Sequence, residues 1–147
     1  MFLRKRLIPK AEERKIVDAI KQAELQTSGE IRVHIEQYCQ DENPIARAIY
    51  IFDAIGMSKT VQRNGVLIYV ALKSRRFAII GDSGINNKIP ANFWDDAKKN
   101  LQTKFAQNDI TQGIIEAIEQ TGQILKKEFP YLEGDINEQS DDISYGK

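Results

Sequence analysis

Oxygen-bearing side chains gather in one segment, Gly81 to Pro90, where an apolar run gives way to Asp, Asn and Gly. Asp82 comes first, and Asn86 follows with Gly84 between them. Hard divalent cations bind carboxylate, amide and carbonyl oxygens, and a glycine leaves the backbone free to turn inward. The segment is not an EF-hand loop, because the twelfth position counted from Asp82 is Phe93 and not Glu. These residues permit a Ca²⁺ or Mg²⁺ site, and the alternative interpretation is an ordinary turn.

Three further side chains are candidates to complete such a site. Asp53 lies one turn before a second polar segment, residues 57–65, and Asn64 within that segment carries a side-chain carbonyl. Asp96 lies in the first turns of the next expected helix. Each has an alternative interpretation: Asp53 as a solvated helix residue, Asn64 as a turn residue that tolerates a left-handed backbone, and Asp96 as a partner of the helix dipole. The predicted metal ligands are therefore Asp82, Asn86, Asp53, Asn64 and Asp96.

These residues do not indicate nucleophilic catalysis by a triad of side chains. His34 is the only histidine, and it lies between Val33 and Ile35 on the polar face of an expected strand, which favours a packing or surface role. Ser83 therefore has no evident base. Cys39 lacks an Arg at the spacing that a cysteine phosphatase loop needs, so we interpret it as a spectator. A lone histidine also cannot build a multi-histidine zinc site.

The composition narrows the class of protein. The chain has 147 residues, 41% of them hydrophobic and 29% charged, which is ordinary for one soluble globular domain. Lys and Arg number 21, and Asp and Glu number 21, so there is no basic surplus to attract nucleic acid. No apolar run has the length of a signal peptide or of a membrane span. We expect a cytoplasmic protein with no membrane span and no nucleic-acid partner.

The hydrophobic periodicity predicts the elements that position these residues. Helical stripes occur in residues 9–25, 45–56, 93–105 and 110–125. Residues 31–36 alternate between apolar and polar, as in a strand with one buried face. Residues 66–72 and 77–80 are apolar on both faces, and the short turn between them predicts an antiparallel hairpin.

The order of the elements is α, β, α, β, β, α, α, and strands that are apolar on both faces require helices on both sides. This predicts an α/β fold: a three-layer α/β/α sandwich with a small mixed central sheet. We expect a single domain over residues 1–132. Residues 133–147 hold five acids and one lysine, and they predict an acidic, mobile tail.

Three stretches carry a pattern that resembles the TPM-domain family: Thr27–Ile31, Arg63–Ala71 and Phe77–Ile85. The resemblance runs from about Ile16 to Leu125. It implies that two loops cross at one end of the sheet and that divalent cations, calcium especially, brace them. Many relatives have an acid where Asn86 stands here, so this chain's site carries less negative charge. Weak acid phosphatase activity has also been attached to relatives.

Two functions are therefore expected. The first is a divalent-metal-binding domain, with Ca²⁺ preferred, whose ion-ordered loops engage a protein partner. The alternative is a weak metal-dependent acid phosphatase, in which a bound ion polarises a phosphoryl oxygen.

Overall fold

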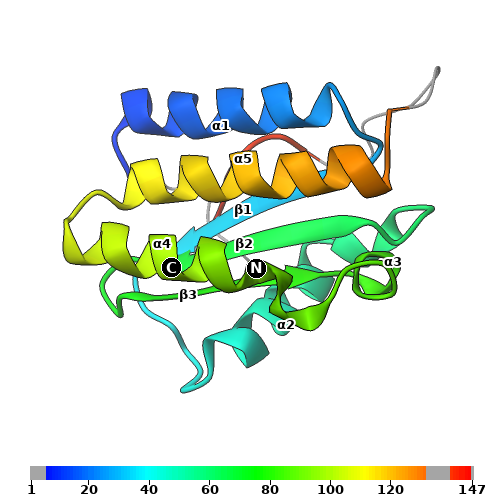
Figure 1. Ribbon diagram of the computed structural model, residues 1–147. Coiled ribbons are helices and arrows are strands. Elements are labelled where there is room, and N and C mark those ends of the chain that lie inside the picture. The colour runs from blue at the N-terminus through cyan, green and yellow to red at the C-terminus, as the bar shows by residue number, and fades with distance from the viewer. Residues whose placement is uncertain (1–5, 132–139, 147) are drawn as a thin grey trace.

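The computed structural model describes residues 6–131 and 140–146 and shows three layers around a four-stranded mixed sheet (Figure 1). The strand order is β3-β2-β1-β4, and helices α1, α4 and α5 lie on one face while α2 lies on the other. This confirms the predicted α/β/α sandwich. The helices are α1 Lys10–Glu24, α2 Pro44–Ala54, α3 Ser83–Asn86, α4 Asp95–Ala106 and α5 Ile110–Glu128, and the strands are β1 Glu30–Glu36, β2 Gly65–Ala71, β3 Arg76–Gly81 and β4 Ser144–Tyr145.

The alternation of the sequence decides how the sheet is covered. Ile31, Val33 and Ile35 of β1 face the larger core, with Ile16 and Ile20 of α1. The apolar β2 is buried along its whole length and contributes to both cores, since alternate residues point to opposite faces. The short connection makes β2 and β3 antiparallel, as predicted, whereas β1 and β2 are parallel and joined through α2.

Helix α2 begins at Pro44 and is capped by the side chain of Asn43. The Asn43 side chain accepts a hydrogen bond from the Ile45 amide at 2.9 Å, and Pro44 occupies the first turn, where its missing N–H costs nothing. The inner side of the helix buries Ala48, Ile51 and Phe52 against the sheet. Since its outer side carries exposed Ile and Tyr residues, α2 is apolar on more than one face.

The two loops predicted to cross do so where α3 meets the chain before β2. Residues 83–86, expected to be part of a loop, form the helical turn α3 with Asp82 as its N-cap. The Gly84 amide donates to the Arg63 carbonyl at 2.9 Å. A Cβ at position 84 would overlap the backbone oxygens of Gln62 and Arg63. Glycine is therefore required for this close approach.

The C-terminal segment adds the fourth strand, which the sequence analysis did not predict. Residues 132–139, which include the first part of the expected tail, lie outside the described residues, but Ser144 and Tyr145 pair in parallel with β1. The Gly146 amide donates to the Ile35 carbonyl at 2.8 Å, and the buried Tyr145 donates its hydroxyl to Glu13 at 2.6 Å. This segment closes part of the outer edge of β1.

The carboxyl group of Glu24 covers the same edge nearer the start of β1. Glu24 accepts the Ile31 amide proton at 2.7 Å. Burial raises the pKa of Glu24 to about 10, helped by a hydrogen bond with Asp141 of the C-terminal segment, although the Ile31 bond opposes the change. The Glu24 carboxyl group is therefore protonated in the folded protein at neutral pH.

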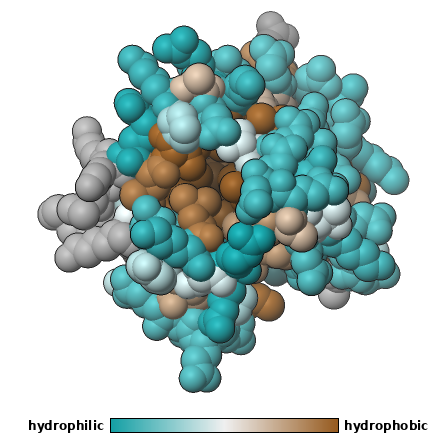
Figure 2. Space-filling view, turned by 90° about the vertical axis from the view of Figure 1, so that its left-hand side faces the viewer, coloured by the Kyte–Doolittle hydropathy of each residue, from teal (hydrophilic) through white to brown (hydrophobic). Residues whose placement is uncertain are grey.

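The surface is not uniformly polar. Figure 2 shows apolar side chains gathered in a hollow rimmed by polar ones, at the end of the molecule that lies at the left in Figure 1. Within residues 6–131 and 140–146, none of the helices combines the length and the apolar character that crossing a bilayer demands.

Candidate functional site

A cleft of about 990 Å³ lies between α2, the end of β3 and α3. Its walls are mainly apolar, with charged and polar groups from both crossing loops. The lining residues are Ile45, Ile49, Tyr50, Phe52, Asp53, Ser58, Arg63, Ile79, Ile80, Gly81, Asp82, Ser83, Asn86, Pro90 and Trp94. A concave apolar surface with a few polar groups is the common form of a binding site.

Asp82 provides the buried charge of this cleft. Its side chain is 5% exposed, and its carboxylate caps α3 by accepting the Ser83 amide proton at 2.7 Å. Arg63 holds both carboxylate oxygens through Nε at 2.8 Å and Nη2 at 2.9 Å. This hydrogen bonding raises the pKa of Arg63. The Arg63 side chain is half exposed, so a solvent-facing cation neutralises a buried anion.

Three of the five predicted ligands, Asp53, Asp82 and Asn86, line the same cleft. Asn64 is buried, donates to the Ser28 carbonyl at 3.2 Å and does not line the cleft. Asp96 is exposed in the first turn of α4 and does not line it either.

The oxygen atoms that line the cleft meet only part of the requirements of a hard cation. Two carboxylates and one amide supply oxygen ligands of the kind that Ca²⁺ binds. The Arg63 guanidinium shows that the position beside Asp82 takes positive charge. Across the part of the chain that the structure describes, however, no three His, Cys, Asp or Glu side chains are grouped as metal ligands. Because Arg63 holds both oxygens of Asp82, an ion there requires Arg63 to move away.

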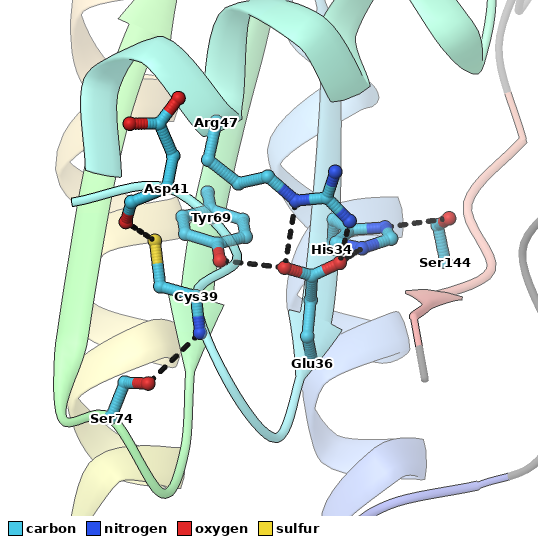
Figure 3. A network of polar contacts seen from close by, with 8 residues as sticks. All are labelled: His34, Glu36, Cys39, Asp41, Arg47, Tyr69, Ser74 and Ser144. Carbon is cyan, nitrogen blue, oxygen red and sulfur yellow. Dashed lines mark hydrogen bonds and ion pairs between the residues drawn. The ribbon is translucent and has the colours of Figure 1, made fainter. Parts of the chain in front are cut away.

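A second polar cluster lies on the α2 side of the sheet, around the fully buried carboxylate of Glu36 (Figure 3). Arg47 of α2 donates to both of its oxygens, at 3.0 and 2.5 Å, and the Tyr69 hydroxyl donates at 2.7 Å. His34 Nε2 lies 3.2 Å from Glu36 Oε1, and His34 Nδ1 lies 2.9 Å from the Ser144 hydroxyl. We call these five residues the Glu36 network.

The hydrogen bonds of the Glu36 network determine its charges. Burial would raise the pKa of Glu36, but hydrogen bonds from His34, Arg47 and Tyr69 hold it at about 2. Burial lowers the pKa of His34, and its bond to Glu36 offsets this only in part. Burial and the bond to Glu36 also raise the pKa of Tyr69. At pH 7 the network therefore contains an ionised Glu36, a charged Arg47 and neutral His34 and Tyr69.

This network was not predicted from the sequence. The alternation predicts His34 on a polar strand face, with a packing or surface role, whereas the side chain is completely buried and hydrogen-bonded at both nitrogens. A signal was present in the spacing, because His34 and Glu36 are two residues apart and so point to the same face of β1.

Comparisons with known proteins agree with this architecture. The family model described as the TPM domain matches residues 4–124. No curated protein sequence matches the chain. The BA42 protein from the psychrophilic bacterium Bizionia argentinensis is similar in structure, with a TM-score of 0.88 and 41% sequence identity, over 98% of this chain and 99% of that chain.

A more distant structure shows the same fold. The N-terminal domain of the cg2496 protein from Corynebacterium glutamicum has a TM-score of 0.59 and 17% identity, over 81% of this chain and 74% of that chain. The family model covers most of the sequence, including both crossing loops and all of β1, β2 and β3. This chain belongs to the TPM domain family.

Proposed function

We propose that this TPM domain is a binding module, in which a protein partner docks in the cleft beside α2 and a divalent cation, Ca²⁺ in preference to Mg²⁺, competes with Arg63 for Asp82. The proposal rests on the pairing of Asp82, whose side chain is 5% exposed, with the half-exposed Arg63 side chain beside a largely apolar cleft. Such a pair can be opened from solvent, and the anion that remains attracts another cation.

The cleft suits a protein partner because its α2 wall presents apolar side chains to solvent. Ile45, Ile49 and Tyr50 are 45%, 58% and 61% exposed. Exposed apolar groups beside a polar rim are typical of surfaces that bind other proteins.

A cation would act on this surface through the crossing loops. Asp82 caps α3, and the backbone carbonyl of Arg63 accepts the Gly84 amide proton. Asp53, Asp82 and Asn86 would hold the ion, while the freed Arg63 side chain would change the charge at the cleft mouth. The ion increases the population of molecules in which Arg63 has left Asp82 only to the extent that it binds this state more tightly than the paired state.

Titration calorimetry with CaCl₂ and MgCl₂ tests this competition. Asp82→Asn should abolish the calcium heat, whereas Arg63→Gln should tighten calcium binding by about tenfold or more, because it removes the competing cation. Asp96→Asn is the matched control, since this acid is exposed and outside the cleft. Identical binding curves for the wild type, Asp82→Asn and Arg63→Gln would refute the proposal.

The alternative, a weak metal-dependent acid phosphatase, stays a prediction from the resemblance. The residues that line the cleft include no histidine to act as a general base. A phosphomonoester assay with and without chelator separates the two functions, because the binding module should show no turnover above the Asp82→Asn background.

A further inference from the structure

The Glu36 network contains a serine, a histidine and a carboxylate joined in series (Figure 3). Strand β1 places His34 and Glu36 on one face, and the register of β4 sets Ser144 directly opposite His34. The hydroxyl lies 2.9 Å from Nδ1, and Nε2 lies 3.2 Å from the carboxylate. A nucleophile within reach of a base that a third group orients is the arrangement of hydrolytic serines.

The direction of each hydrogen bond follows from the charge of Glu36. An ionised carboxylate can only accept, so Nε2 of His34 must carry the proton that it donates. In a neutral imidazole the other nitrogen is then a hydrogen-bond acceptor. The Ser144 hydroxyl therefore donates to Nδ1, the ring nitrogen that can take up its proton, with the roles of the two nitrogens reversed relative to a Ser-His-Asp triad.

We propose that Ser144 is an activated nucleophile that accepts an acyl group from a small activated ester, with His34 as its general base. The Ser144 oxygen forms a bond to the carbonyl carbon as its proton passes to His34 Nδ1. The alkoxide leaving group departs with its electron pair and takes the proton back from His34. The products are an ester of Ser144 and an alcohol, and His34 returns to the neutral form.

The rest of the network serves as positioning residues for this step. Glu36 fixes the His34 ring and faces the positive charge that forms on it, and it is itself held by Arg47 and Tyr69. His34 and Glu36 are fully buried, whereas Ser144 is half-buried. A reagent can therefore approach the network only from the Ser144 side, which favours small acyl donors.

This site is separate from the proposed metal and partner cleft. Ser144, His34 and Glu36 do not line that cleft. A failure of one proposal consequently leaves the other standing, and the Asp82→Asn variant should acylate normally.

The test uses a small fluorophosphonate and p-nitrophenyl acetate, with intact mass and peptide mapping of the purified protein. We expect one adduct, on Ser144, formed on the order of 100-fold faster than on other serines, as general-base catalysis allows. Ser144→Ala should lose the adduct. Ser140→Ala should keep it, since Ser140 is an exposed serine of the same segment.

The pH dependence of the labelling rate distinguishes general-base catalysis by His34 from a merely structural hydrogen bond. The labelling rate of the wild type should be constant at neutral pH and should fall as His34 becomes protonated, below its ordinary pKa of 6.5. This measurement needs no variant and so remains valid if substitutions at His34 unfold the protein. Labelling of Ser144 at the rate of Ser140, or a rate without this acid limb, would overturn the proposal.

Discussion

Substituting Glu36 by Gln tests how the buried network stabilises the fold. The side chain is fully buried, and the change leaves the Arg47 guanidinium, itself only 10% exposed, beside a neutral amide. A lowering of the Glu36 pKa from 4.5 to about 2 corresponds to about 3 kcal/mol, because each tenfold change in an equilibrium constant is about 1.4 kcal/mol. Removing one partner of a buried ion pair costs about 3–5 kcal/mol, which agrees.

Urea unfolding followed by the fluorescence of the single tryptophan, Trp94, measures this cost. Because the folded-state pKa of Glu36 lies below the unfolded value, its stabilisation is complete above pH 4.5 and is lost as the pH falls toward about 2. The gap between the wild type and Glu36→Gln should therefore be widest at pH 7 and narrow at pH 3. Glu42→Gln, an exposed acid in the next loop, is the control. A gap under 1 kcal/mol at pH 7 (about a quarter of the expected cost), or one that does not change with pH, would refute the reasoning.

Three other substitutions give sharp expectations. Glu24→Gln should stabilise the protein at pH 7 by about 2–3 kcal/mol and have little effect at pH 4. The reason is that the folded-state pKa of Glu24 is raised, so that only the unfolded chain releases the proton at neutral pH. The amide oxygen of Gln can still accept the Ile31 amide proton, and thermal melts at both pH values check the sign of the effect. Gly84→Ala should cost roughly 2 kcal/mol or more, because the methyl group meets backbone oxygens of the crossing loop; a melting temperature equal to that of the wild type would contradict this contact. Tyr145→Phe should cost about 1 kcal/mol through the lost bond to the partly exposed Glu13, and it should speed amide exchange in β4.

The longer helices and strands were predictable because the apolar pattern of each one extends over many residues. Long apolar stripes gave the four main helices, and the runs that became β2 and β3 were apolar on both faces, as strands covered from two sides must be. By contrast, α3 has four residues and β4 has two, too few for a period to show. Tertiary contacts alone decide such short elements.

The candidate sites were less accessible to sequence reasoning. Asp82, Asp53 and Asn86 could be grouped, because each lies beside one of two loops at the same end of the sheet. The pairing of Asp82 with Arg63 could not be derived, since it depends on the way the loops cross. Alternation in β1 predicts one buried and one polar face, yet His34 on the polar face is completely buried and bonded to Glu36 and to Ser144 of β4.

The partnership of β4 with β1 also bears on the order in which the molecule folds. His34 and Ser144 are separated by 110 positions, whereas β2 and β3 are joined by a turn of only a few residues. Closing a long loop costs more chain entropy than closing a short one, so hairpin contacts form early and distant pairings late. We expect β4 to be the last strand to join the sheet and the first to leave it, so that the imidazole of His34 meets solvent before the rest of the core opens.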